Sequence, residues 1–298
     1  MDNNLSSTET KPQQIKQETG SLKVRGVDHY YEWIRQPETG EKPVMVFVHG
    51  WGGSSRYWRS TAESLSDNYD CLLYDLRGFG RSKLPENPLG LSYELEEYAE
   101  DLKGLLDGLG LDKVYMNSHS MGASVGALFT TMYPDMVERS ILTCNGIFEY
   151  NKLAFDTFHK FGGYVVKFRY NWFLKVPFAP RLFMARFLHR PIDKLEKIAF
   201  LEDFILADYE AALGTIYTSV SKKAVEIMPK KFAEISVPTL LISGEKDIII
   251  PAKMGLEAAK LNDKIEYVEI AKTAHFPMLE DSKTYLTKVR EFLNLSIV

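Results

Sequence analysis

Short apolar runs alternate along the chain with longer segments in which apolar residues recur at helical spacing. Apolar runs without polar alternation are typical of strands covered on both faces, and strands that alternate with helices form a parallel sheet. We therefore expect an α/β fold with a mostly parallel central sheet and helices on both faces. The predicted strands cover residues 43–50, 69–75, 113–119, 139–146, 238–244 and 265–270, and the predicted helices cover 55–66, 92–109, 121–133, 251–261 and 281–293.

The N-terminal segment departs from this alternation. Residues 1–20 are polar and show no periodic apolar pattern, which predicts a disordered tail. Residues 21–35 are rich in β-formers and contain Gly26, Val27 and Asp28, which predicts two antiparallel strands with a hairpin turn at those three residues.

A second departure lies between residues 147 and 231. This segment contains no convincing strand, and its pattern is typical of several helices separated by glycines and prolines. The simplest account is a helical cap inserted over the ends of the strands. The core domain would then comprise residues 21–146 and 232–298.

Composition narrows the classes of function. The 298 residues carry a net charge of −4 and have a pI of about 5.9, which argues against a general nucleic-acid-binding protein. No run of about 18 apolar residues occurs, and the N-terminus lacks the layout of a secretory signal, so we expect a cytoplasmic protein. Cys71 and Cys144 lie in apolar runs, so we expect two buried reduced thiols and neither a disulfide nor a zinc cluster.

The junction between a predicted strand and a predicted helix at residues 118–122, Ser-His-Ser-Met-Gly, is the strongest candidate for chemistry. A serine at such a corner sits in a tight, strained turn that needs small neighbours, and Ser118 and Gly122 supply them. The hydroxyl of Ser120 would be exposed above the sheet, beside helix N-terminal amides that can stabilise an anion. An ordinary turn would also use serine and glycine, so the junction alone leaves both interpretations open.

Residues 49–55, His-Gly-Trp-Gly-Gly-Ser-Ser, form a glycine-rich exit from the first central strand. The segment has neither the Lys-Ser/Thr ending of a phosphate-binding loop nor the spacing of a dinucleotide-binding turn. It is either a merely tight turn or a loop that brings backbone N–H groups close to a developing oxyanion. We favour the second interpretation, in which the amide of Trp51 is the natural donor.

A serine nucleophile needs a base to take its proton and a carboxylate to orient that base. Among six histidines, His275 follows the last predicted strand on a loop that can reach the top of the sheet, so it is the best candidate base by position. Asp247 follows the preceding strand in the same manner. The chain order Ser120, Asp247, His275 is the order of the α/β hydrolases.

Other polar residues near these positions are given structural roles. His119 is expected to point away from Ser120. Asp75 lies at a strand end beside two arginines, which favours a structural ion pair. Glu245 and Asp107 are alternative carboxylates by position, but both are expected to be solvated surface charges.

Taken together, these motifs resemble the α/β-hydrolase superfamily in its cap-bearing, serine esterase and lipase-like form. The resemblance runs from about residue 42 to 292, and it implies that no cofactor or metal is needed. It departs at Ser118, where the family usually has glycine, so we expect strain and a less sharp turn. The motifs that carry it are the oxyanion loop at 49–52, the arginine-glycine turn at 75–82, the turn at 118–122, the acid loop at 244–251 and the histidine loop at 274–277.

The resemblance implies acyl transfer through a Ser-His-Asp triad and an acyl-enzyme. Ser120 would attack a carbonyl, His275 would accept its proton, and Asp247 would hold the imidazole in the right tautomer. The amides of Trp51 and Met121 would bind the oxyanion.

The expected function is hydrolysis of carboxylic esters with apolar acyl groups, on a small-molecule or lipid substrate. Alternatives on the same fold are a carbon–carbon bond hydrolase, a thioesterase, a prolyl aminopeptidase, a cofactor-free peroxidase and a non-catalytic ligand receptor. Epoxide hydrolases and haloalkane dehalogenases are disfavoured, because those members place an aspartate where Ser120 stands.

The cap has an unusual composition. Residues 151–190 contain eight Lys or Arg against one acid, in a chain of net charge −4. Our favoured interpretation is that an aromatic stripe packs onto the core and lines an acyl pocket, with the lysines solvated. The alternative is a basic aromatic cap that makes peripheral contact with an anionic membrane surface. The stripe comprises Phe155, Phe158, Phe161, Val165, Phe168 and Trp172.

Overall fold

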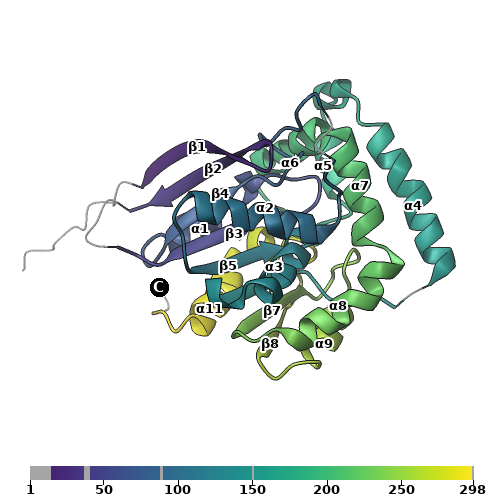
Figure 1. Ribbon diagram of the computed structural model, residues 1–298. Helices are drawn as coiled ribbons and strands as arrows, with labels where there is room; N and C mark the ends of the chain where they lie inside the picture. The colour runs from purple at the N-terminus through teal and green to yellow at the C-terminus, as the bar shows by residue number, and fades with distance from the viewer. Residues whose placement is uncertain (1–14, 37–40, 88–89, 150, 297–298) are drawn as a thin grey trace, which may run out of the picture.

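The computed structural model describes residues 15–36, 41–87, 90–149 and 151–296 (Figure 1). Eight strands form one sheet in the order β1-β2-β4-β3-β5-β6-β7-β8. The first two strands pair antiparallel to each other and β2 pairs antiparallel to β4, whereas all other neighbours are parallel. The strands are β1 (Lys16–Val24), β2 (Val27–Arg35), β3 (Val44–Val48), β4 (Asp70–Tyr74), β5 (Val114–His119), β6 (Val137–Thr143), β7 (Thr239–Gly244) and β8 (Ile265–Ile270).

Helices cover both faces of the sheet, as predicted. Each predicted central strand and core helix is present, with ends that differ from the predicted ones by at most three residues when the 3-10 turn η1 (Ser55–Trp58) is counted with α1. The core helices are α1 (Arg59–Leu65), α2 (Leu95–Gly108), α3 (Met121–Met132), α9 (Ala252–Ala259), α10 (Pro277–Glu280) and α11 (Ser282–Phe292), with 3-10 turns η1 (Ser55–Trp58) and η2 (Pro134–Met136).

The central strand β3 shows why the apolar runs lack alternation. Its side chains Val46 and Val48 pack in the apolar layer that contains α2 and α3, whereas Met45 and Phe47 pack in the layer that contains α1 and α11. Both faces of the strand are therefore buried, and neither accepts polar residues.

The N-terminal prediction needs two corrections. Strand β1 begins at Lys16, so residues 16–20, which were expected in the disordered tail, belong to the sheet. Residues 1–14 lie outside the described part of the chain. The hairpin turn lies at Arg25 and Gly26, both with positive φ, one residue earlier than predicted. Edge strand β1 pairs mainly through its backbone and is largely exposed, so its composition gave little apolar signal.

Between β6 and β7 the chain leaves the sheet, and residues 147–231 form no strand in their described part. The last of these helices continues to Glu234, past the predicted boundary at residue 231. The helical elements are α4 (Lys152–Lys167), η3 (Asn171–Lys175), α5 (Ala179–Met184), α6 (Lys194–Leu206), α7 (Tyr209–Ser219) and α8 (Lys222–Glu234). We refer to residues 147–234 as the cap.

Candidate active site

Ser120 occupies the single residue between β5 and α3. Its backbone has φ 55° and ψ −124°, a conformation that costs a non-glycine residue on the order of 1–3 kcal/mol. Neighbouring groups hold it in place, since the Ser120 amide donates to the carbonyl of Thr143 at 2.8 Å and its carbonyl accepts from the Asn145 side chain at 3.1 Å. The strained turn raises the hydroxyl above the carboxyl end of the sheet.

Ser118 does not relax this turn, contrary to our expectation of a less sharp one. Its hydroxyl is buried and donates to the carbonyl of Ile141 at 3.0 Å. The space for it comes from Gly126, where a Cβ atom would lie 2.6 Å from the Ser118 Oγ. Gly126, one helical turn after Gly122, therefore leaves room for the Ser118 side chain, and Ser120 keeps its positive φ.

Three predicted side chains from three separate loops meet in one hydrogen-bonded row. The Nε2 atom of His275 lies 2.9 Å from Ser120 Oγ, and its Nδ1 lies 2.7 Å from Asp247 Oδ2. The second carboxylate oxygen of Asp247 accepts the backbone amides of Ile249 at 2.8 Å and Ile250 at 3.1 Å. Asp247 and His275 are buried and Ser120 is half-buried, so the row is shielded from water at its acidic end. This arrangement can activate the serine hydroxyl as a nucleophile.

The glycine-rich loop passes close to the start of α3. A Cβ atom on Gly122 would lie 2.3 Å from the carbonyl oxygen of His49, so only glycine permits this approach. His49 Nε2 accepts the amide of Leu76 at 2.9 Å, so its proton is on Nδ1, which donates to the Gly50 carbonyl at 2.8 Å. Burial lowers the pKa of His49, which favours this neutral form.

These contacts fix the direction of the predicted oxyanion donors. In a trans peptide the N–H points opposite to the C=O, so the amide of Trp51 points away from the His49 ring. Met121 is the first residue of α3, so its amide has no carbonyl partner one turn earlier in the helix. Neither observation conflicts with the predicted role of the two amides as anion donors, which stays a prediction.

The sequence and structure comparisons are consistent with this geometry. A family model described as the alpha/beta hydrolase fold matches residues 43–282, which is most of the chain. The chain belongs to the α/β hydrolase family.

Known hydrolases share this fold over very different lengths of sequence. Epoxide hydrolase 1 of Caenorhabditis elegans is 32% identical over 124 residues, which cover 42% of this chain and only 29% of that protein. The uncharacterized hydrolase YugF of Bacillus subtilis is 24% identical over 277 residues, covering 91% of this chain and 96% of that protein. The solved enol-lactonase of Burkholderia xenovorans LB400 is 22% identical with a TM-score of 0.75, covering 92% and 100%. The family match and these relatives support hydrolase activity, but they do not identify the substrate.

Sequence reasoning missed a second buried row in this hydrolase. The Gly50 amide donates to the Tyr57 hydroxyl at 2.5 Å, and that hydroxyl lies 2.9 Å from His119 Nδ1. Because the His275 carbonyl, 2.7 Å from His119 Nε2, can only accept, the proton of the neutral imidazole lies on Nε2, and Nδ1 accepts the Tyr57 hydroxyl. His119 thus points away from Ser120, as expected, and links the glycine-rich loop to the histidine loop. No local pattern marks Tyr57 for this role.

Burial keeps both members of this row neutral. It raises the pKa of Tyr57 well above its usual range and lowers the pKa of His119 well below its own, the latter assisted by nearby His275. The row can therefore fix positions, but it has no charge to offer the reaction.

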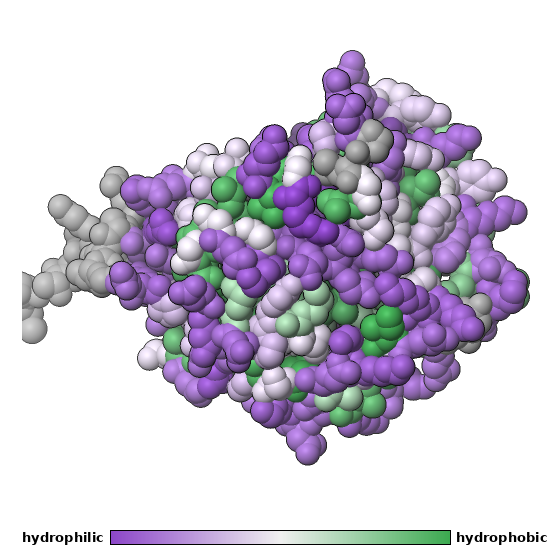
Figure 2. Space-filling model, in the orientation of Figure 1, coloured by the Kyte–Doolittle hydropathy of each residue, from purple (hydrophilic) through white to green (hydrophobic). Residues whose placement is uncertain are grey.

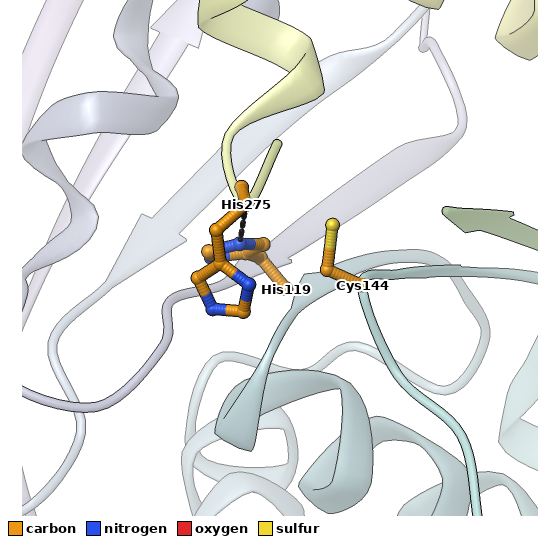
Figure 3. Close-up of side chains that lie close together, drawn as sticks. All are labelled: His119, Cys144 and His275. Atoms are coloured by element: carbon orange, nitrogen blue, oxygen red, sulfur yellow. Dashed lines mark hydrogen bonds between the residues drawn. The ribbon is translucent and has the colours of Figure 1, made fainter. Parts of the chain in front are cut away.

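Cys144 completes a cluster with His119 and His275, whose possible ligand atoms lie within 4.8 Å of one another (Figure 3). The hydrogen bonds described above already account for the nitrogens of both histidines. Burial, and Asp247 nearby, raise the pKa of the Cys144 thiol well above its usual range, which disfavours the thiolate a metal needs. We therefore assign no metal to this cluster. Cys71 and Cys144 are both free and buried, as expected.

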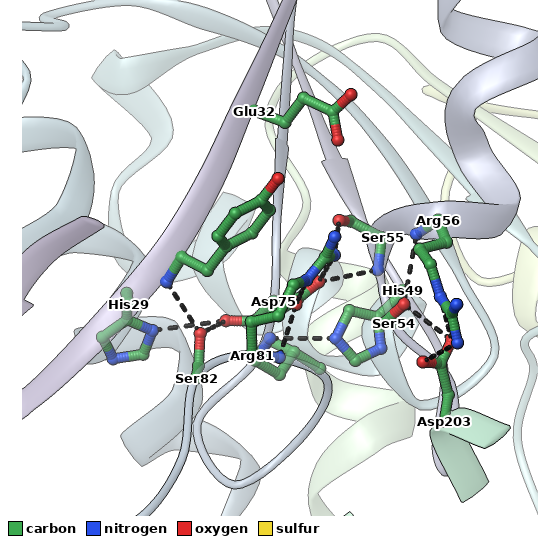
Figure 4. A network of polar contacts seen from close by, with 12 residues as sticks. His29, Glu32, His49, Ser54, Ser55, Arg56, Asp75, Arg81, Ser82 and Asp203 are labelled. Atoms are coloured by element: carbon green, nitrogen blue, oxygen red, sulfur yellow. Dashed lines mark hydrogen bonds and ion pairs between the residues drawn. The ribbon is translucent and has the colours of Figure 1, made fainter. Parts of the chain in front are cut away.

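Asp75 has the predicted structural role, with one correction (Figure 4). Its carboxylate accepts from Arg81 Nε at 2.6 Å and Nη2 at 2.7 Å, and from the amide of Ser55 at 2.9 Å. The second arginine, Arg77, pairs instead with Asp101 at 2.7 Å. Burial would raise the pKa of Asp75, but the hydrogen bonds and charge of Arg81 outweigh it and hold the pKa below its usual range. Asp75 thus anchors the segment that follows the glycine-rich loop.

Replacing Asp75 with asparagine should lower the free energy of unfolding by about 3 to 5 kcal/mol at neutral pH, because Arg81 loses its buried partner. The pKa of Asp75 is lower in the folded than in the unfolded chain. Its stabilising contribution is therefore complete above the unfolded-state pKa and is lost as pH falls through the folded-state pKa. Urea denaturation at several pH values should show the gap between the two proteins narrowing in acid.

The matched control is Asp107→Asn, since that carboxylate is 54% exposed and pairs with Lys103 on the surface. This replacement should lower the free energy of unfolding by less than about 1 kcal/mol at any pH. If the difference in free energy of unfolding between Asp75→Asn and the wild type stays constant with pH, the structural role assigned to Asp75 is wrong.

Glu245 pairs with Lys246 at the surface, as Asp107 does with Lys103, so neither alternative carboxylate reaches the site.

The cap is bonded to the loops of the site. The Trp51 indole donates to the carbonyl of Ala212 in α7 at 2.9 Å, and the His275 amide donates to the carbonyl of Phe187 at 2.9 Å. From α6, Asp203 accepts from Ser54 at 2.7 Å and from Arg56 at 2.6 Å. Burial raises the pKa of Asp203, although Arg56 and Ser54 offset part of this effect.

Proposed function

We propose that this hydrolase cleaves carboxylic esters with apolar acyl groups through an acyl-enzyme on Ser120. The observation that carries the proposal is the row from Ser120 Oγ through His275 to Asp247, at 2.9 Å and 2.7 Å. A serine at a strained turn, hydrogen-bonded to an imidazole that a buried carboxylate orients, is the arrangement required for nucleophilic acyl transfer.

In the first half of the reaction, Ser120 Oγ attacks the ester carbonyl while His275 Nε2 takes its proton. The oxyanion accepts hydrogen bonds from the amides of Trp51 and Met121. His275 then gives the proton to the departing alcohol oxygen, which leaves an ester on Ser120. In the second half, water attacks that ester, His275 again takes and returns the proton, and the free acid leaves.

The side chains that the cap brings to the site favour an apolar acyl group. The ring of Phe187 lies 6.1 Å from the His275 ring, and Phe204 lies 5.5 Å from the Trp51 ring. Phe183 in turn lies 4.6 Å from Phe204. An alkyl chain packed against these rings would bury apolar surface at about 25 cal/mol per Å².

Epoxide opening fits this site less well, although several relatives are epoxide hydrolases. Attack of a serine oxygen on an epoxide carbon would form an ether, which has no carbonyl for water to attack. The covalent intermediate could not then be released by the same machinery. Acyl substrates, including lactones, return the free serine in two balanced steps.

Labelling with a fluorophosphonate, followed by intact mass measurement, tests the nucleophile. We expect one adduct per chain, located on Ser120 and absent from Ser120→Ala. A series of p-nitrophenyl esters of increasing chain length, with a lactone and a p-nitrophenyl carbamate beside it, tests the substrate class. We expect kcat/KM to rise with acyl length. Labelling without turnover of any ester would contradict the proposed substrate class, and no labelling would contradict the nucleophile.

A further inference from the structure

Four members of the aromatic stripe of the cap lie in solvent, so our favoured interpretation is wrong for these four residues. Phe161, Phe168 and Trp172 are 63%, 49% and 56% exposed, and Val165 is 49% exposed. Phe155 is the one member with a described side chain that is buried. Phe161, Val165, Phe168 and Trp172 therefore do not pack on the core or line an acyl pocket.

The packing of α4 explains this result. The helix packs against α7 through its small residues, since a Cβ on Gly162 would lie 2.9 Å from the Ile216 side chain and one on Gly163 would lie 3.2 Å from the Tyr217 hydroxyl. Val166 is buried on the same side. The glycines make a flat contact face, so the bulky residues point outward. Figure 1 shows α4 at the outer edge of the molecule, beyond α7.

The exposed rings form one continuous surface. Tyr164 stacks on Phe168 with ring centroids 6.2 Å apart, and Phe168 lies 6.2 Å from Tyr170. Through Phe173, at 6.4 Å from Tyr170 and 4.2 Å from Trp172, the surface extends onto η3. By contrast, the face over α2 and α3 is mainly hydrophilic (Figure 2). We call the exposed set the cap surface: Phe161, Tyr164, Val165, Phe168, Tyr170 and Trp172.

Unpaired cations accompany the cap surface. Lys160, Lys167 and Lys175 are exposed, and no acidic side chain in the described part of the chain pairs with them. Residues 151–190 together carry a charge of +7, which leaves −11 on the rest of the chain. Such a dipolar distribution would turn the cap toward an anionic surface and the core away from it.

We propose that the cap surface binds the anionic surface of a lipid bilayer. Its lysines would contact headgroup phosphates, and its Trp and Tyr rings would lie at the boundary between headgroups and acyl chains, where such amphipathic rings are enriched. A second copy of the chain is a poorer occupant, because the exposed lysines of two cap surfaces would then face each other. Among the described residues no helix is long and apolar enough to cross a bilayer, so contact through this surface would be peripheral.

The proposal does not depend on the ester chemistry, so its test measures binding alone. The full chain is sedimented with vesicles of phosphatidylcholine, or of phosphatidylcholine with about 30 mol% phosphatidylglycerol. We expect at least about tenfold stronger binding to the anionic vesicles, and a marked loss between about 0.1 M and about 0.5 M NaCl. Ser120→Ala should bind as the wild type does.

Two variants separate the parts of the surface. The triple variant Lys160→Gln, Lys167→Gln, Lys175→Gln should weaken binding at least about tenfold. The matched control removes three exposed lysines elsewhere, through Lys23→Gln, Lys253→Gln and Lys283→Gln, with the same change in net charge, and should bind as the wild type does. The pair Phe168→Ser and Trp172→Ser should weaken binding even at low salt, because both side chains are exposed and their loss should spare the fold.

Three results would overturn the proposal. One is equal binding to both kinds of vesicle, and another is equal loss in the lysine triple and its control. The third is a dimer in analytical ultracentrifugation that Phe168→Ser and Trp172→Ser dissociate, since the cap surface would then be an interface between copies of the chain.

Discussion

Ser120→Ala is expected to reduce kcat for the best ester substrate by about a millionfold, the loss typical of removing a serine nucleophile. The variant loses the one oxygen that lies 2.9 Å from His275 Nε2, so no acyl-enzyme can form. The melting temperature should change little, because Thr143 and Asn145 hold the backbone of residue 120. The slow ester hydrolysis that remains, by water with the help of the oxyanion donors, should show no initial burst of released alcohol.

The matched control is Ser140→Ala in β6. That hydroxyl is also buried, but it has no hydrogen-bond partner in the described structure, so its removal should leave kcat unchanged. Ser120→Ala that retains more than about a hundredth of wild-type kcat would remove Ser120 from the reaction, because oxyanion binding alone does not give such rates.

Asp247→Asn is expected to lower kcat about ten-thousandfold while the fold is retained. The oxygen Oδ1 of Asp247 accepts two backbone amides, from Ile249 and Ile250. An asparagine must keep its carbonyl oxygen there, so its NH₂ group faces His275 Nδ1 and donates to it. The histidine proton then moves to Nε2, which can no longer accept the proton of Ser120.

Glu245→Gln tests whether this effect belongs to Asp247 alone. Glu245 lies two residues earlier, is bonded to the surface residues Lys246 and Lys272, and should leave kcat within about twofold. Nitrogen chemical shifts of His275 should report the change of tautomer in Asp247→Asn. Wild-type activity in that variant, or an unchanged tautomer, would exclude Asp247 as the group that orients the base.

The sequence predicts the central sheet because both faces of its strands are buried. A strand such as β3 has no polar alternation, and a run this short between turn residues favours a buried strand over a buried helix. The three residues of the row were predictable because each follows a strand whose carboxyl end must lie at the same edge of a parallel sheet. Strand order in the chain therefore already brings Ser120, Asp247 and His275 to one side.

Other features depend on contacts that no local pattern encodes. The Tyr57 hydroxyl accepts a hydrogen bond from the Gly50 amide and donates one to His119 only because η1 packs beside the glycine-rich loop. Helical spacing in the cap marks which residues share a face of α4, but it does not say which face meets α7. The glycines at 162 and 163 decide that, through close approach to Ile216 and Tyr217. The sequence predicts only part of edge strand β1 for a similar reason, since the pairing of this strand needs only backbone groups.

The hydrogen bonds from the Trp51 indole to Ala212 and from the His275 amide to Phe187 couple the position of the cap to the position of two catalytic loops. An outward swing wide enough to admit a bulky molecule must break them or drag both loops along. With the cap open, the amide of Trp51 and the imidazole of His275 would each be displaced, and the enzyme would be inactive. Substrate entry and reaction would then require the cap to open and close in turn.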